Sequence, residues 1–250
     1  MSKKAAYVRS LGDNALILSQ RLSEWCGKGP ALEEDMALTN VALDLIGQAR
    51  LWLSHAALLD DAGGNEDQLA FLRDAPQFTN LLLVEQPNGS YADTLVRQFF
   101  FDVWHYFLLD ELTRCNDSGI AEIAQKSIKE VTYHVRRSGD LMVRLGDGTE
   151  MSHRMLQQAV EQLWMYTGEM FSSDETDRAL EAEGIAPNLG VVRAQWLKHV
   201  QEIMEEATLT LPSVDAWMQS GGKQGKHTEH LGYLLAEMQF LQRAYPGASW

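Results

Sequence analysis

The sequence predicts an all-α protein with one core. Apolar side chains recur at helical spacing along most of the chain, and no convincing segment alternates with the period of two typical of a strand. With 250 residues, 45% hydrophobic content and seven Trp, the chain can build one extensive core. It has no internal repeat and no low-complexity linker. We therefore expect a single helical domain over residues 1–250.

The first two helices are predicted from apolar stripes that end at turn-forming residues. Helix 5–27 ends near Gly27 and Pro30, and its Asp13 and Glu24 fall on the face opposite the apolar stripe. Helix 34–59 ends in a loop at 60–65 that is rich in Asp and Gly.

An irregular crossover at 73–88 follows, because Pro76 and Pro87 flank an apolar run too short for another long helix. The remaining expected helices are 91–114, 120–145, 152–171, 172–184, 189–207 and 228–244. Ser172 to Glu175 resembles the capping box that would start the helix at 172–184.

Helix 91–114 is apolar nearly all round, which predicts a central position. Helical geometry places Asp102 in the middle of one of its apolar faces. An unpaired buried charge costs several kcal/mol. We therefore expect Asp102 to be either protonated or matched by donors such as Gln48 or His134.

Helix 120–145 has a regular apolar stripe, and His134 falls on it. Four-helix proteins with two iron ions in the core use inward Glu residues together with Glu-x-x-His, because side chains at i and i+3 reach one metal from one face. Here the stretch is Val131-Thr132-Tyr133-His134. The histidine is present, but valine cannot bind a metal. The pattern predicts a di-iron type of bundle without the iron.

Other residues could in principle hold a single metal: Asp102 with His105 on one helix, and Glu130 with His134 on the next. We expect Asp102 and His105 to be unequally inward and Glu130 to lie at the edge of its stripe. The helix at 34–59 adds only the amide of Gln48. A core of satisfied polar residues is therefore the favoured interpretation.

Three further features receive structural interpretations. Gly221 to Lys226 predicts a flexible basic loop, since no strand precedes it and the spacing of a phosphate-binding loop is missing. His227 to His230 is explained by helix capping through Thr228 and Glu229. Cys26 and Cys115 stand alone and are expected to be reduced, mostly buried thiols.

The formal net charge of −14 opposes binding to nucleic acid and to anionic membranes, and it favours docking to a more basic protein. No run of about 18 apolar residues predicts a membrane span, and the polar N-terminal sequence does not resemble a secretory signal. We expect a cytoplasmic protein.

Three motifs resemble the C subunits of the bacterial phenylacetyl-CoA epoxidases. They are Leu11-Gly12-Asp13-Asn14 with Leu18-Ser19-Gln20-Arg21-Leu22, Asn80-Leu81-Leu82-Leu83-Val84-Glu85-Gln86-Pro87-Asn88-Gly89, and His227-Thr228-Glu229-His230-Leu231-Gly232 with Leu235-Ala236-Glu237-Met238-Gln239. The resemblance implies a ferritin-like four-helix bundle core with additional C-terminal helices. It also implies a place in a multicomponent oxygenase that inserts one oxygen atom from O2 across the aromatic ring of phenylacetyl-CoA.

In such complexes the homologous A subunit holds the di-iron site through two Glu-x-x-His motifs. The matching stretches here resemble Leu45-Ile46-Gly47-Gln48, where both ligands are replaced, and Val131-Thr132-Tyr133-His134, where only the histidine remains. Asp102 stands near a third ligand position. The resemblance therefore implies a degenerate site at Leu45, Gln48, Asp102, Val131 and His134, with no catalytic, metal-binding or cofactor-binding residue in this chain.

The function implied is that of a non-catalytic structural subunit in phenylacetate catabolism. Its expected partners are the catalytic A subunit, the small B subunit and the reductase, and it is expected to form a homodimer or hetero-oligomer. Di-iron would belong to the A subunit, and FAD, an iron–sulfur cluster and NADPH to the reductase.

Two alternatives stay open at this stage. One is a metal-binding oxygenase in its own right that uses Asp102, His105, Glu130 and His134. The other is a helical bundle that binds a CoA ester near Lys223 and Lys226.

Overall fold

The computed structural model describes residues 2–60 and 64–248. Within these residues every regular element is a helix and no strand is found, which confirms the all-α fold class. The chain divides into two compact units, one made of residues 1–87 and 221–250 and the other of residues 88–220. The single domain expected over 1–250 stays a prediction.

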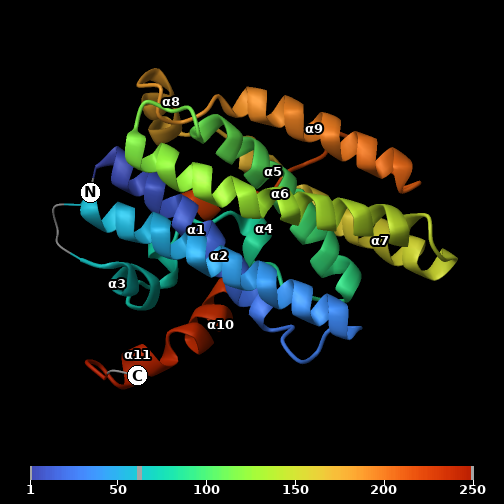
Figure 1. Cartoon of the computed structure of the whole chain (residues 1–250), viewed down its shortest axis with the longest axis horizontal. Helices are drawn as coiled ribbons and strands as arrows, with labels where there is room; N and C mark the ends of the chain where they lie inside the picture. Colours follow the sequence, from blue (N-terminus) through green and yellow to red (C-terminus); the bar gives the residue numbers. More distant parts are fainter. Residues whose placement is uncertain (1, 61–63, 249–250) are drawn as a thin grey trace. The chain divides into compact units, whose positions relative to one another are not determined.

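The second unit is built around α5 (Tyr91–Leu112). Three helices pack against α5 (Figure 1): α6 (Ser118–Gly146), α7 (Glu150–Leu163) and α9 (Leu189–Glu206). Every residue of α5 from Thr94 to His105 is buried. The central position predicted for this helix is therefore confirmed.

The chain after α7 departs from the prediction of one helix over 152–171. The α-helix ends at Leu163, and the 3-10 turns η2 (Trp164–Tyr166) and η3 (Gly168–Phe171) follow it. A Cβ atom on Gly168 would lie 2.6 Å from Cγ of Met218. Close packing against this later segment, which helical periodicity does not reveal, accompanies the change of helix type.

The short helix α8 (Glu175–Ala182) begins three residues later than predicted. Its capping box uses Asp174 and Asp177, and Asp174 Oδ1 accepts a hydrogen bond from the Asp177 amide at 2.8 Å. The capping box predicted from Ser172 is therefore wrong. The Asp side chains satisfy the helix N-terminus in its place.

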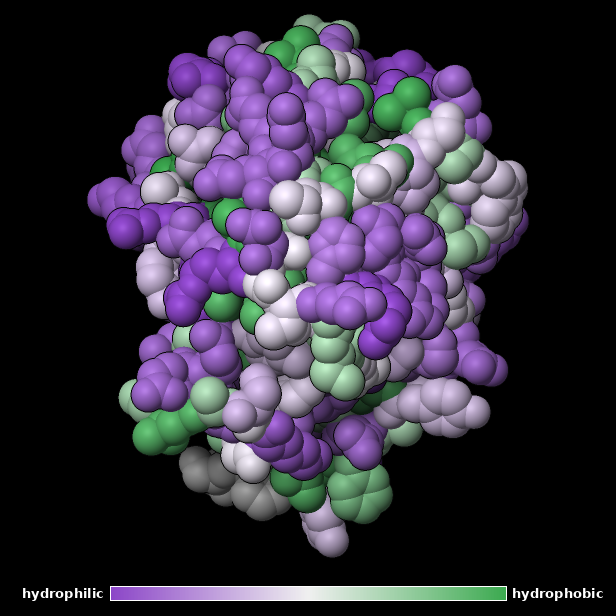
Figure 2. All heavy atoms as spheres, turned by 90° about the vertical axis from the view of Figure 1, so that its right-hand side faces the viewer, coloured by the Kyte–Doolittle hydropathy of each residue, from purple (hydrophilic) through white to green (hydrophobic). Residues whose placement is uncertain are grey.

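The surface is strongly polar over the face shown in Figure 2, where hydrophobic side chains are scattered. No helix among the described residues is long and apolar enough to cross a membrane. The prediction of mostly buried thiols is wrong, because Cys26 is exposed and Cys115 is partly exposed. Cys26 follows the end of the first helix, where the chain turns at the surface.

The first unit contains the helix pair α1 (Lys3–Ser23) and α2 (Leu32–Leu58), which lie side by side (Figure 1). A Cβ atom on Gly12 would lie 2.7 Å from the Leu53 side chain, so glycine permits this close approach. The first helix ends four residues earlier than predicted, because residues 24–28 form a turn. Of the loop predicted at 60–65, residues 61–63 lie outside the described part of the chain.

Short elements complete the first unit. They are α3 (Glu66–Phe71), η1 (Ala75–Gln77), α4 (Leu82–Glu85), η4 (Gly222–Gln224), α10 (Glu229–Met238) and α11 (Phe240–Ala244). The irregular crossover predicted at 73–88 is confirmed, whereas α3 was not predicted. The last helix, expected to run without interruption over 228–244, is broken at Gln239. The side-chain amide of Gln239 donates hydrogen bonds to the carbonyls of Ala70 and Arg73, at 3.0 and 2.9 Å.

Asp13 of α1 was predicted to lie on the face opposite the apolar stripe. The structure shows that its side chain is nevertheless fully buried. Both carboxylate oxygens bind the guanidinium of Arg73, and one of these contacts measures 3.0 Å. The backbone amide and the hydroxyl of Thr79 also donate to Asp13, at 3.0 and 3.2 Å. This buried ion pair attaches α1 to the crossover.

Glu85, the last residue of α4, is also fully buried and accepts four hydrogen bonds. Its donors are Asn80 Nδ2 at 3.0 Å, His227 Nδ1 at 2.8 Å, and the Thr228 amide and hydroxyl at 2.6 and 2.8 Å. We call Glu85, Asn80, His227 and Thr228 the Glu85 cluster. Its contacts join the crossover to the start of the C-terminal helices.

The Glu85 cluster also corrects two predictions about residues 221–230. Thr228 makes no side-chain hydrogen bond to the helix it precedes, so capping does not explain this motif. The loop before it forms a defined turn, in which Gly225 has a φ of +71° and lies against the Pro76 carbonyl. The basic loop was predicted to be flexible. In the structure it is packed onto the crossover.

His227 has an oxygen acceptor at each ring nitrogen, since Nε2 lies 2.9 Å from the Phe78 carbonyl and Nδ1 faces Glu85. These two contacts fix the orientation of the His227 ring between Glu85 and the backbone of the crossover. Arg21 of α1 adds two hydrogen bonds to the Glu85 carbonyl, at 3.1 and 2.8 Å.

Replacing Glu85 with Ala should lower the free energy of unfolding by ~3–5 kcal/mol, because it leaves buried donors without their acceptor. Urea denaturation followed by circular dichroism measures the effect. The control is Glu237→Ala on α10, whose side chain is exposed. Equal midpoints for the two variants would contradict the role given to the Glu85 cluster.

Candidate functional site

The five positions predicted to be a degenerate metal site are all buried. Leu45 and Gln48 lie on α2 in the first unit, and Asp102, Val131 and His134 lie on α5 and α6 in the second. None of these side chains is more than 1% exposed. Helical periodicity therefore predicted correctly that each of them points inward.

Asp102 accepts a hydrogen bond from Gln98 Nε2 at 2.6 Å, one helical turn earlier on α5. Burial raises the pKa of this carboxyl to about 6, and nearby His134, Gln98, Ser138 and Arg137 oppose the rise. His134 acts on Asp102 electrostatically, and the donor given for the carboxylate is Gln98, whereas Gln48 and His134 were expected. Gln98 was missed, although its i, i+4 spacing from Asp102 was a signal for this contact.

His105 is 5% exposed and Asp102 1%, so the expectation that they are unequally inward is wrong. The His105 ring lies among aromatic rings, with its centroid 5.1 Å from that of Phe101. Burial, and to a smaller extent the neighbouring His134, lower the pKa of His105 to about 3. A neutral His105 contributes stability above the ordinary pKa of 6.5, and this contribution is lost as the pH falls from there toward 3.

The donor set of the second unit does not fit a di-iron centre. Asp102 supplies one carboxylate and His105 and His134 two imidazoles, whereas such centres use carboxylates from several helices. Val131, three residues before His134, offers no donor atom. Within residues 2–60 and 64–248 no group of three or more His, Cys, Asp or Glu is arranged to hold a metal ion.

The structure also separates residues that the two alternative functions would combine. Glu130 is exposed, whereas His134 on the same helix is buried, so the two do not face one site. The metal-binding alternative loses one of its four ligands. Lys223 and Lys226 line neither of the two cavities described in this structure. Neither of these two cavities therefore supports the CoA-ester alternative.

A catalytic side chain must also be accessible to a substrate. Neither of the two described cavities is lined by Asp102, His105 or His134. A general acid or base must come within hydrogen-bonding distance of the group it serves.

Comparison with known proteins identifies the family. Residues 1–250 match the family described as phenylacetic acid catabolic protein. The chain belongs to this family. It is 53% identical to the C subunit of the 1,2-phenylacetyl-CoA epoxidase of Escherichia coli (strain K12), over 251 residues that cover 100% of both chains. Family membership and the all-α structure confirm the predicted ferritin-like class of fold.

The motifs that carried the resemblance meet in the first unit of the structure. Asp13 and Arg21 come from the first motif, Glu85 from the second, and His227 from the third. Arg21 and His227 both contact Glu85, which the sequence did not predict, whereas Asp13 contacts Arg73 and Thr79. Each of these residues has a buried hydrogen-bonding partner, which explains why such polar side chains occur inside a helical core.

Asp102→Asn should stabilise the protein by ~1–3 kcal/mol at pH 7, with about half of that gain at pH 5. The folded pKa of about 6 lies above the ordinary 3.8, so the cost of ionising Asp102 grows as the pH rises between these values. Asparagine removes the charge and retains an acceptor for Gln98. Urea denaturation of both proteins between pH 5 and pH 7.5 provides the measurement.

Asp140→Asn is the matched control, because Asp140 lies exposed on α6. Its effect on the free energy of unfolding should be small at every pH. An Asp102→Asn variant that is destabilised at pH 7, or whose difference from wild type does not change with pH, would show that the carboxyl is not strained by burial.

Proposed function

We propose that this chain is a non-catalytic structural subunit of a multicomponent 1,2-phenylacetyl-CoA epoxidase, and that it supports a homologous di-iron catalytic subunit. The name of its relative, the C subunit of such an epoxidase, supports the assignment to the complex and to phenylacetate catabolism. The matching lengths of the two chains support the same place in the assembly.

One observation carries the non-catalytic part of the proposal. At the position where a Glu-x-x-His motif would supply a carboxylate, α6 has Val131, which is fully buried and apolar. Leu45 on α2 is likewise apolar and buried where a second motif would begin. Replacing carboxylates with aliphatic side chains removes the charge that would hold two iron ions.

The exposed face of α2 supports association with another protein. The apolar side chains of Leu32, Met36, Leu43, Ile46 and Leu58 are 72, 57, 61, 39 and 85% exposed. At 3.6 residues per turn they fall within a sector of about 120°. Several exposed apolar side chains on one face of a helix favour contact with another protein. We name these five residues the α2 stripe.

The proposed partners are the catalytic A subunit, which would contact the α2 stripe, and the small B subunit and reductase in the same complex. Glu33, Glu34 and Asp35 in the first turn of α2 favour a basic rim on the partner. Di-iron would reside in the A subunit, FAD and an iron–sulfur cluster in the reductase, and NADPH would supply the electrons. The predicted cytoplasmic location forms part of this proposal.

A catalytic subunit would gain rigidity from such a partner. Metal ligands on several helices must hold their geometry within fractions of an ångström, so small helix shifts alter the site. A second bundle that packs against those helices restricts the shifts. An obligate interface of this kind buries more than ~2,000 Å² in total.

Epoxidation by the catalytic subunit with its reductase should depend on this chain, because the interface keeps the ligand helices in place. The assay compares turnover with the chain, without it, and with a Leu43→Glu variant that places a charge in the α2 stripe. We expect Leu43→Glu to abolish co-purification and to reduce turnover at least tenfold, while the circular dichroism spectrum stays unchanged.

Met151→Glu is the control, because Met151 is 64% exposed on α7 and lies outside the α2 stripe. It should co-purify and support turnover like the wild type. Full turnover in the absence of the chain would refute a required structural role.

Purified protein should contain no stoichiometric iron, manganese or zinc, because Leu45, Gln48 and Val131 occupy the expected ligand positions. Metal analysis by mass spectrometry after purification without chelators tests this. About one tightly held metal ion per chain, lost in a His134→Ala variant, would favour the metal-binding alternative.

A further inference from the structure

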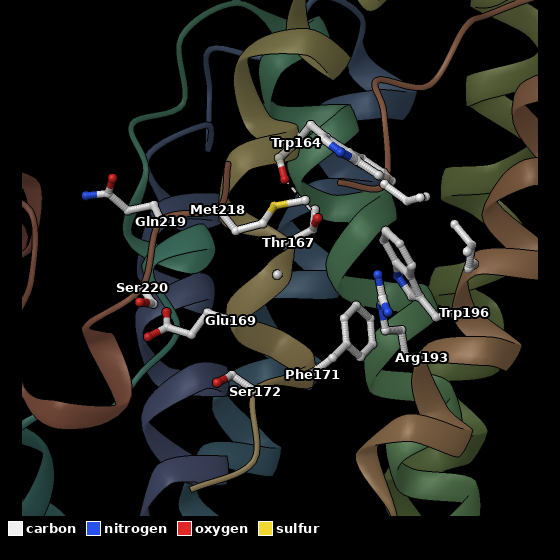
Figure 3. Close-up of a pocket in the computed structure, with 13 residues that line it drawn as sticks. Trp164, Thr167, Glu169, Phe171, Ser172, Arg193, Trp196, Met218, Gln219 and Ser220 are labelled. Atoms are coloured by element: carbon white, nitrogen blue, oxygen red, sulfur yellow. Dashed lines mark hydrogen bonds between the residues drawn. The ribbon is translucent and has the colours of Figure 1, made fainter. Parts of the chain in front are cut away.

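The second unit contains a cavity of about 370 Å³ that the proposed function does not use. The turns η2 and η3, one side of α9, and the segment 214–220 form its walls (Figure 3). Trp164, Phe171 and Trp196 contribute aromatic side chains. The volume falls within the range of small-ligand pockets, roughly 300–1,000 Å³.

Hydrogen bonds hold the walls of this cavity in place. The indole of Trp164 donates to the Ser213 carbonyl at 3.1 Å, and the backbone amide of Gln219 donates to the Met165 carbonyl at 2.8 Å. Both bonds attach the 214–220 side to the η2 turn. The cavity is therefore formed before any ligand arrives, which lowers the cost of ordering it on binding.

Trp164 and Trp196 line the cavity but are only 3 and 2% exposed, so the partly exposed Phe171 presents most of the accessible ring surface. The Trp196 indole donates to the Phe100 carbonyl at 2.9 Å, so its N–H is occupied, as is that of Trp164. The ring centroids of Phe171 and Trp196 are 5.2 Å apart, and those of Trp164 and Trp196 are 5.8 Å apart. Such a cluster favours a planar aromatic group through stacked or edge-to-face contacts.

The charges around the cavity are asymmetric. Arg193 of α9 is exposed, and within the described residues its guanidinium takes part in no hydrogen bond or ion pair. Glu169 is only 2% exposed and lies on the other side of the cavity in Figure 3. An anion is attracted toward Arg193 and repelled from Glu169. Arg193 can also donate two parallel hydrogen bonds to a carboxylate or a phosphate.

We propose that this cavity binds a small molecule in which a planar aromatic ring carries an anionic group. The ring lies against Phe171 and Trp196, and the anionic group pairs with Arg193 at the rim. The proposal does not depend on the structural role in the epoxidase complex, because neither the Asp102 region nor the α2 stripe lines the cavity.

Isothermal titration calorimetry and tryptophan fluorescence on the purified full-length chain test the proposal. The probes are phenylpropanoate and phenyl phosphate, which share the ring and the negative charge, phenylpropanamide, which is neutral, and hexanoate, which has no ring. We expect saturable binding of at least one of the first two. The amide and hexanoate should bind at least tenfold more weakly, because each lacks one of the two contacts.

Arg193→Gln should weaken binding of the anionic probe about tenfold or more, and Phe171→Leu should weaken it about threefold or more. Arg193 is exposed, so its replacement leaves the core intact. The control is Lys198→Gln on the same helix, whose side chain is 79% exposed and which does not line the cavity. It should bind like the wild type.

Four results would overturn the proposal: no saturable binding of either aromatic anion, equal binding of the neutral amide, equal binding of hexanoate, or unchanged affinity in Arg193→Gln. A preference for phenyl phosphate over phenylpropanoate, or the reverse, would support the proposal and identify the anionic group within the proposed class. None of these results depends on epoxidase activity, so the two proposals fail separately.

Discussion

The structure of the first unit depends on one buried carboxylate. Glu85 ends a single turn of helix in an irregular crossover and accepts hydrogen bonds from residues 142 and 143 positions later in the chain. Its own carbonyl binds Arg21, 64 positions earlier. A buried carboxyl group is stable only when its oxygens are hydrogen-bonded, and the Glu85 carbonyl needs Arg21, so Glu85 requires α1 and the C-terminal segment to be in place together. The irregular backbone of the crossover is ordered by these contacts.

The residues that identify the family are therefore structural in this chain. Asp13, Arg21, Glu85 and His227 belong to the motifs that resemble epoxidase C subunits, and each of them satisfies a buried partner in the first unit. Under the proposed function, Leu45 and Val131 would stand where a di-iron protein places carboxylates. The polar groups of the first unit would then serve the fold and not a metal ion.

Burial also changes the ionisation of the acidic and basic side chains in the second unit. It raises the pKa of Asp102 to about 6 and lowers that of His105 to about 3, so each side chain is pushed toward its neutral form. Gln98 on the same helix donates a hydrogen bond to one oxygen of Asp102. Helices α5 and α6 can then pack closely, whereas fully charged side chains between them would repel one another or require hydration.

The sequence by itself determined the long helices, the central position of α5 and the burial of Asp102 and His134, because helical periodicity is a local property. It also identified the family through its motifs. Only the tertiary structure decided that Asp13 is buried, since its partner Arg73 lies 60 residues away. Likewise, the sequence predicts a helix cap at Thr228, but the structure shows that Glu85 accepts the hydrogen bonds of Thr228. Periodicity shows which way a side chain points, whereas the stability of a buried charge depends on partners that folding alone brings to it.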